Sequence, residues 1–562
     1  MKILFKRPLL VLAVACLPAI YFLLRKGFYE PQDLHHIADI FEMYRALVSG
    51  QFPPRMGPDY LWNFGYPLFN FYYVLPFYLG TIFYALTRSL SGAFEFVFVV
   101  SAIFSVFGMY LFLREFFGKA ASLAGSILYL YSPYRAVQIY VRGAMGEALA
   151  MAAVPFVFWG AARVIKNPNK SNILVLTLSL GALILSHNYI WLLTAPWLAL
   201  FLLIGVTRIK NKLKSIKAIA FGVILGAGIT AYWWLPAVRE SGLVSSLTPF
   251  LLEDHFPFIK QLLIPSWGYG ASLPGPYDGM SFQIGIINLA AVLFAFGIIL
   301  IKRKNLEKYK SVLVVAFLGF LVSALMMNIR TLPIWKLLPI YQFVQFPWRL
   351  LFLTTFFSAT LAAFVIELSP KRLHRFLGLA VVILSMALTW GYFRPSRLVN
   401  KPDDFYLSRM FATMKEVGEK EAASKDYVNW SEDYLLLPPN VKKASSLFLA
   451  KVVGDDNLRI LNLEKINPIH FKAEIEAGIA GKLTFYSINF PGWYSKVDGV
   501  NAPITQGMPY GQIEVIIPSG KHAVEFYWAE TPLRKIGDFI SLISIGVVIV
   551  LIYRSRKNHG RA

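Results

Sequence analysis

Long apolar runs recur along this chain, and they limit its possible folds more than any other feature. Hydrophobic residues make up 56% of the 562 residues and charged residues 15%, whereas a soluble chain carries roughly 25% charged residues. A helix of about 17–25 apolar residues can cross the hydrocarbon core of a bilayer. We therefore predict an all-α polytopic membrane protein with about 12–14 transmembrane helices. The candidate spans lie near 8–24, 68–87, 93–113, 118–132, 145–164, 172–187, 189–207, 218–236, 283–301, 311–327, 348–366, 373–393 and 536–553.

The positive charge lies in short clusters between these runs. The net charge is +23, but Lys and Arg do not gather on one face, so the pattern favours cytoplasmic loops over a nucleic-acid partner. Basic clusters at both termini place both ends in the cytoplasm, which requires an even number of spans, and the candidates are odd in number. The conflict falls between residues 68 and 113. Either 68–87 is re-entrant or interfacial, or two crossings are merged there.

The tract 394–535 differs in composition from the rest. Its charge is higher, and residues alternate between apolar and polar in 483–488 and 513–517, with glycines between the runs. This pattern predicts a small β-sandwich-like domain. Counting spans back from the C-terminus places this domain outside the cytoplasm. We thus expect a multi-spanning domain over 1–393, an extracytoplasmic β domain over 394–535, and a final helix with a basic tail over 536–562.

The first external loop, 25–67, contains Asp33, His35, His36 and Asp39. On a helix starting near Asp33, Asp33 and His36 would share one face, with His35 and Asp39 on the other. A carboxylate and an imidazole at this spacing can form a general base and its orienting partner. The alternative is a helix N-cap followed by solvated polar residues.

The same loop could also hold a metal. Two histidines with two aspartates can bind a divalent cation, but no third set of ligands is visible and the lone Cys16 excludes a cysteine-based zinc site. No residue is therefore assigned as a metal ligand. A divalent cation stays open as a cofactor.

Several arginines lie at the predicted outer ends of spans. Arg135 and Arg142 precede a span that begins with Glu147 in its first turn, and Arg349 follows Gln345 before another. Guanidinium groups bind phosphate in a bidentate manner, although arginines at helix ends also extend toward water without a ligand. Two interpretations also stay open for His187, which either caps a helical hairpin or lines a cavity.

Aromatic residues crowd the stretch 62–72, which includes Trp62 and Tyr66. They can form an interfacial belt, or a stacking surface for sugar rings and isoprene units. Composition alone favours the belt.

Together these segments resemble a family of polytopic prokaryotic membrane proteins named for a relation to 6-pyruvoyl-tetrahydropterin synthase. No soluble pterin-synthase domain is visible, so the name implies no pterin chemistry. The segments that carry the resemblance are Asp33–His36 with Arg45, 50–55 including Arg55, 62–72, Tyr134 and Arg135 with Glu147, 186–188, and 345–349.

The external domain resembles that of YfhO-type bacterial membrane proteins, through 490–499 and 518–522. Both groups are similar in layout to GT-C glycosyltransferases, in which the first external loop carries an acidic catalytic residue and the donor is a polyprenyl phosphate sugar. GT-C enzymes often show paired acidic residues in that loop, whereas here two histidines follow Asp33.

The resemblance implies a transferase in the cell membrane that passes a sugar from a polyprenyl-phosphate donor to a cell-envelope acceptor on the outer face. Asp33 would be the base and His36 or His35 its orienter. Inversion is favoured, because retention needs a second carboxylate, for which Asp39 is the near candidate. The rival classes are a transporter or flippase for lipid-linked sugars and an envelope assembly factor. The residues expected to bind substrate are His35, Arg45, Arg55, Trp62, Tyr66, Arg135, Arg142, Glu147, His187, Gln345 and Arg349.

Overall fold

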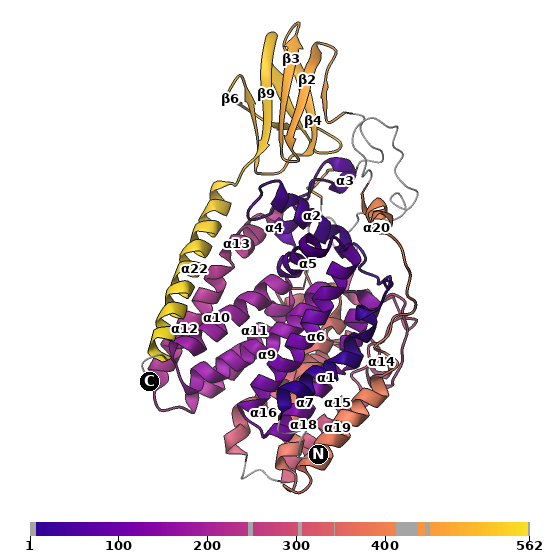
Figure 1. The fold of residues 1–562 in the computed structure, drawn as a ribbon, viewed down its shortest axis with the longest axis vertical. Coiled ribbons are helices and arrows are strands. Elements are labelled where there is room, and N and C mark those ends of the chain that lie inside the picture. The colour runs from indigo at the N-terminus through magenta and orange to yellow at the C-terminus, as the bar shows by residue number, and fades with distance from the viewer. Residues whose placement is uncertain are drawn as a thin grey trace.

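The chain forms a helical body with a β domain at one end of its long axis (Figure 1). The computed structural model describes residues 7–245, 251–301, 306–341, 343–411, 437–443 and 450–559. The last helix, α22 (Pro532–His559), leaves the β domain and runs down the side of the body (Figure 1). The predicted class is confirmed: a mostly helical chain with apolar helices, a C-terminal β domain and a final apolar helix.

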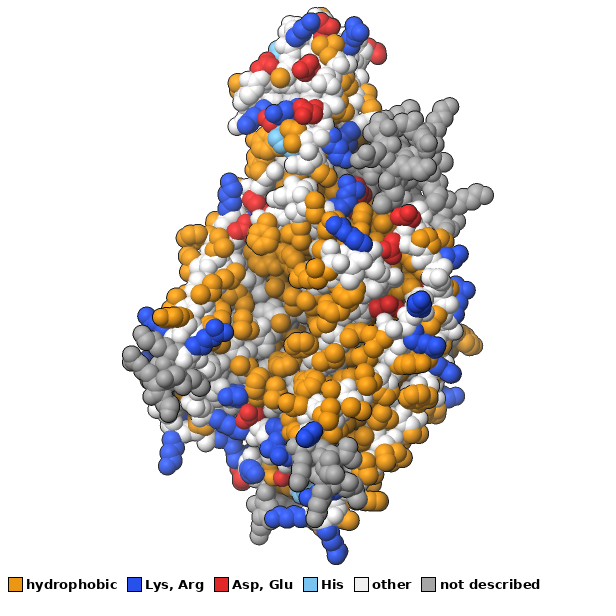
Figure 2. Space-filling view, in the orientation of Figure 1, with side chains coloured by type: hydrophobic (Ala, Val, Ile, Leu, Met, Phe, Trp, Pro, Cys, Tyr) orange, Lys and Arg blue, Asp and Glu red, His pale blue; other side chains and the backbone are white. Residues whose placement is uncertain are grey.

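Within the described residues, six helices are long and apolar enough to cross a membrane, or seven if one bent pair counts as a single span. The bent pair is α12 (Lys212–Ile229) and α13 (Ala231–Arg239), which meet at 73°. Hydrophobic side chains cover the middle of the body, and charged ones gather towards its two ends (Figure 2). The six helices are α6 (Leu90–Arg114), α9 (Met145–Lys166), α11 (Ile190–Thr207), α16 (Lys310–Met326) with the turn before it, α18 (Leu351–Leu368) with the turn before it, and α22.

Other predicted spans are helical but short. The stretch 68–87 is broken into α4 (Leu68–Phe71) and α5 (Leu75–Thr87). At 1.5 Å per residue, α5 is about 20 Å long, which is less than the hydrocarbon core of about 30 Å. This break favours the re-entrant or interfacial alternative for that stretch. The remaining apolar helices are α1 (Pro8–Ile20), α7 (Lys119–Leu130), α10 (Lys170–Ser186), α15 (Ile286–Ile301) and α19 (His374–Thr389).

Short elements connect these helices. The segment 25–67 contains α2 (His36–Val48) and α3 (Tyr60–Asn63), which lie below the β domain with α4 and α5 (Figure 1). A π-helical segment, η3 (Val137–Arg142), follows α8 (Pro133–Ala136). The other short helices are α14 (Ile259–Leu263), α17 (Leu332–Leu337) and α20 (Asp403–Met410).

The β domain is a two-sheet sandwich with antiparallel pairing. Apolar residues alternate along β3 (His470–Ala477) and β4 (Gly481–Ile488). Their buried faces meet in a common core that includes Phe471, Phe485 and Phe526. Of the tract 394–535, residues 412–436 and 444–449 lie outside the described ranges. One sheet has the order β1 (Val452–Gly454), β4 (Gly481–Ile488), β8 (Gln512–Ile517), β7 (Thr505–Gln506); the other has β2 (Leu458–Asn467), β3 (His470–Ala477), β9 (Gly520–Trp528), β5 (Trp493–Val497), β6 (Val500–Ala502).

The loop 25–67 packs against this sandwich. Met56 joins the β-domain core. The Phe64 carbonyl accepts hydrogen bonds from the Ser487 hydroxyl at 2.7 Å and the Ile488 N–H at 3.3 Å. The Lys451 ammonium donates to the Asn63 carbonyl. The β domain therefore fixes the loop that contains the candidate site.

Candidate active site

A turn positions Asp33 against the π-helical segment. The Asp33 N–H donates to the Arg142 carbonyl at 2.7 Å, and the Gln32 N–H donates to the Val141 carbonyl at 3.1 Å. Arg142 ends η3, and Gly143 follows it with a φ of 69°. This left-handed turn is favourable for glycine. It reverses the chain so that Arg142 faces Glu147 in the first turn of α9.

Glu147 is the centre of a buried charge cluster. Its Oε1 accepts from Arg142 at 2.6 Å and from Arg349 at 2.9 Å. Its Oε2 accepts from the Tyr134 hydroxyl at 2.8 Å and from Gln138 at 2.6 Å. Both oxygens of Glu147 are thus occupied, and it holds two guanidinium groups in place.

Asp33 lies at the open side of this cluster. An Arg142 nitrogen is 3.5 Å from its carboxylate, and the Asp33 side chain is 29% exposed. The Glu147 side chain, by contrast, is 1% exposed. Asp33 is therefore the carboxylate of the cluster that an external molecule can reach.

Arg349 has one guanidinium nitrogen without a hydrogen-bond acceptor. Its Nε donates to Glu147 and its Nη2 lies 3.3 Å from Gln345 Oε1. Its buried Nη1 has no hydrogen-bond partner among the described residues. A buried guanidinium N–H without a partner is costly, so an added acceptor such as a phosphate oxygen would stabilise it.

His36 pairs with Asp39, and the expectation that they lie on opposite helix faces was wrong. The helix α2 begins at His36, not at Asp33, and residues three apart are only about 60° apart around a helix. His36 Nδ1 lies 2.9 Å from Asp39 Oδ2, and the Tyr60 hydroxyl donates to Asp39 Oδ1 at 2.5 Å. The Tyr73 hydroxyl is 3.1 Å from His36 Nε2.

Tyr73 joins this group to the charge cluster. Its ring packs on His187 with centroids 5.2 Å apart, and His187 Nε2 is 3.9 Å from Glu147 Oε1. A Cβ added to Gly146 would lie 2.3 Å from the Tyr73 ring, so the close approach requires glycine there. His187, Glu147, Arg142, Arg349, Gln345 and Asp33 therefore form one connected set.

Other predicted residues lie elsewhere. Arg135 is fully buried, and its guanidinium donates to the Ala148 carbonyl at 2.8 Å and to the Ser105 hydroxyl. These contacts do not join it to Arg142, Glu147 and Arg349, and its expected binding of substrate stays a prediction. Its neighbours come from α6 and α9, which sequence spacing does not reveal.

The loop residues Arg45, Arg55, Trp62 and Tyr66 stabilise the loop itself. Arg45 pairs with Asp59. Arg55 is 1% exposed and bonds to Glu530 at 2.9 Å and Asp538 at 3.1 Å, which ties the loop to α22. Trp62 is buried in the left-handed segment 61–63, and the Tyr66 backbone pairs with Gly57.

Three residues of the site were missed from sequence: Tyr60, Tyr73 and Gln138. Tyr73 directly follows the aromatic stretch 62–72, and Gln138 lies one helical turn before Arg142. Polarity inside an otherwise apolar stretch was a usable signal for Gln138. Nothing local marked Tyr60.

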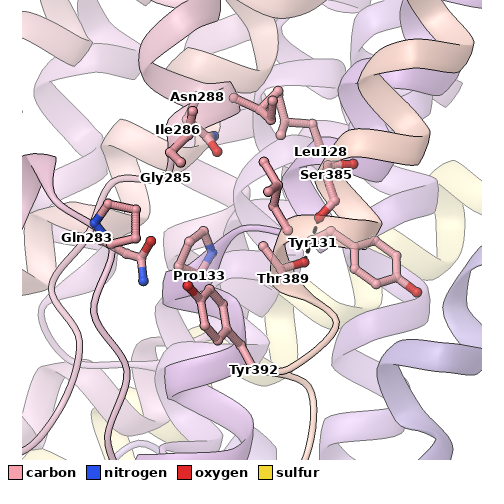
Figure 3. A pocket seen from close by; sticks show the side chains of 13 residues that line it. Leu128, Tyr131, Pro133, Gln283, Gly285, Ile286, Asn288, Ser385, Thr389 and Tyr392 are labelled. Carbon is pink, nitrogen blue, oxygen red and sulfur yellow. Dashed lines mark hydrogen bonds between the residues drawn. The ribbon is translucent and has the colours of Figure 1, made fainter.

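A separate cavity of about 100 Å³ lies between α7, α15 and α19 (Figure 3). Its lining includes Tyr131, Asn288 and Tyr392, and none of its lining residues belongs to the charge cluster. The Asn288 amide donates to Ser358 at 2.8 Å. This cavity is not part of the candidate site.

Comparison with known proteins places the chain among relatives. A family model described as "6-pyruvoyl-tetrahydropterin synthase related domain; membrane protein" matches residues 69–396, which is more than half of the chain. The chain belongs to this family of membrane proteins. The predicted family is thereby confirmed, as is the assignment to a membrane.

One curated relative is an uncharacterized protein of Lactococcus lactis subsp. cremoris (strain MG1363). It is 24% identical over 337 residues, which are 58% of this chain and 52% of the relative. The match therefore spans about half of the relative's length.

Two solved structures show a partial likeness. Arabinofuranosyltransferase AftD from Mycobacteria has a TM-score of 0.45 at 11% identity, over 70% of this chain and 27% of that one. The Archaeoglobus fulgidus oligosaccharyltransferase, tethered with an acceptor peptide, has a TM-score of 0.44 at 11% identity, over 79% of this chain and 60% of that one. At these scores the likeness supports no functional inference.

Proposed function

We propose that this chain is a membrane glycosyltransferase that moves a sugar from a polyprenyl-phosphate donor to a cell-envelope acceptor on the outer face. One observation carries the proposal. A partly exposed carboxylate, Asp33, lies beside two guanidinium groups that Glu147 holds in place, and one of them, on Arg349, retains an unpartnered N–H.

The charges of the cluster suit the reaction. Arg142 and Arg349 against Glu147 leave one excess positive charge, which Asp33 balances. When Asp33 accepts a proton from the acceptor hydroxyl, it loses its negative charge. The excess positive charge of the two guanidinium groups then stabilises the leaving phosphate. Fixed guanidinium groups aimed at a developing charge are an effective means of stabilising a transition state.

The bonds balance as follows. The acceptor oxygen forms a bond to the anomeric carbon and gives its proton to Asp33. The bond from the anomeric carbon to the phosphate oxygen breaks, and the polyprenyl phosphate leaves with the electron pair. Direct displacement inverts the anomeric centre. Asp39 is fully buried against His36 and Tyr60, which supports inversion over a second nucleophilic carboxylate.

The test compares two acids of the same loop. In membranes supplied with radiolabelled polyprenyl-phosphate sugars, Asp33→Asn should lower transfer by roughly 10²–10⁴-fold, as expected for loss of a general base. Glu30→Gln is the control, because Glu30 pairs with the exposed Arg397. Equal transfer by wild type and Asp33→Asn would remove Asp33 from the mechanism.

A further inference from the structure

The start of α2 gathers three side chains with metal-binding atoms. His35, His36 and Asp39 each offer one ligand atom, and these atoms lie within 4.8 Å of one another. His36 and Asp39 are 1% and 0% exposed. Two imidazoles and a carboxylate form a common ligand set for a transition-metal ion in proteins.

The charge of Asp39 points to a cation. Among the described residues, the ion-pair partner of this fully buried carboxylate is His36 alone. Glu147, by comparison, is held by two arginines. A buried carboxylate without a fixed cation is strongly unfavourable. A bound metal ion would compensate this charge.

The surroundings of these three side chains suit metal binding. The hydroxyls of Tyr60 and Tyr73 contact Asp39 and His36 at 2.5 and 3.1 Å. Such outer partners orient metal ligands in protein sites.

We propose that His35, His36 and Asp39 bind a divalent first-row transition cation, such as Zn²⁺ or Ni²⁺, at the start of α2. Imidazole ligands favour these ions over Mg²⁺ and Ca²⁺, which prefer all-oxygen sites. The site is measurable in the purified protein whether or not that protein transfers sugar.

The test uses Co²⁺ as a spectroscopic probe. The full chain is purified in detergent, stripped with a chelator and titrated with Co²⁺, and the visible ligand-field absorption and the bound metal are both measured. We expect about one Co²⁺ per chain. His36→Gln and Asp39→Asn should weaken binding by at least about tenfold, since even outer-shell losses typically cost 10–100-fold.

Two further variants guard against misfolding and surface binding. His35→Cys should keep the metal and add a thiolate-to-cobalt charge-transfer band, because a thiolate can replace an imidazole as ligand. His522→Gln removes an exposed His–Asp pair of the β domain, 2.6 Å from Asp498, and should leave binding unchanged.

Substoichiometric Co²⁺ in the wild type would overturn the proposal. So would binding that survives both His36→Gln and Asp39→Asn, a His35→Cys spectrum without the new band, or binding lost in His522→Gln.

Discussion

Glu147 is the residue on which the candidate site most depends. It accepts hydrogen bonds from Tyr134, Gln138, Arg142 and Arg349 inside the helical body. Removing one member of a buried ion pair leaves an uncompensated charge, whereas a half-exposed pair contributes little.

Glu147→Gln should therefore lower the free energy of unfolding by about 3–5 kcal/mol. Glu115→Gln, which disrupts a more exposed pair with Lys166, should cost less than about 1 kcal/mol. Thermal unfolding of both variants in detergent provides the comparison. Similar melting temperatures for the two would show that the cluster does not stabilise the fold.

At the scale of elements, the β domain and the loop 25–67 form a continuous contact. The left-handed segment 61–63 lies between Tyr60, which bonds to Asp39, and Phe64, which accepts from Ser487 and Ile488. Non-glycine residues in this region are strained, so the β domain helps to hold the loop in shape.

Lys451 gives this contact a pH dependence. Burial, with the nearby charge of Lys465 as the next cause, lowers its pKa to about 7. Between that value and the ordinary lysine pKa near about 10.4, the unfolded chain binds a proton that the folded chain lacks, so stability should rise with pH across this range. Melting temperatures of wild type and Lys451→Met, measured from about pH 6 to about pH 9, test this sign.

Lys451→Met should flatten the curve, while Lys482→Met, at an exposed pair with Glu514, should not. A curve that falls with pH in the wild type, or that Lys451→Met leaves unaltered, would contradict this assignment.

The sequence predicts these elements better than it predicts their contacts. Apolar runs and alternation identified the helices and strands β4 and β8, because both patterns follow from local backbone geometry. The pairing of His36 with Asp39 follows from helix geometry, because residues three apart lie only about 60° apart around a helix. The start of α2 at His36 could not be fixed from sequence, because helix ends are poorly determined locally. Arg135 bonds to Ser105, which is 30 residues away, and no local rule gives such a contact.

At the scale of the whole molecule, we propose that the β domain and the candidate site lie outside the cytoplasm. The basic loops between spans support this orientation through the positive-inside rule. The chain has a single cysteine, Cys16, which is buried. Replacing Cys16 with serine gives a background without thiols for labelling experiments.

In that background, Ser519→Cys in the β domain should react with a membrane-impermeant maleimide on intact cells. Lys210→Cys, in the loop between α11 and α12, should react only after permeabilisation. The reverse pattern would place the β domain in the cytoplasm.

The most direct measurement is the fate of a radiolabelled sugar on polyprenyl phosphate in vesicles that contain the purified protein and envelope acceptors. We predict that the label leaves its carrier, that free polyprenyl phosphate forms in equal amount, and that Asp33→Asn prevents both. Label that crosses the bilayer while still attached to polyprenyl phosphate would contradict the transferase and identify a flippase.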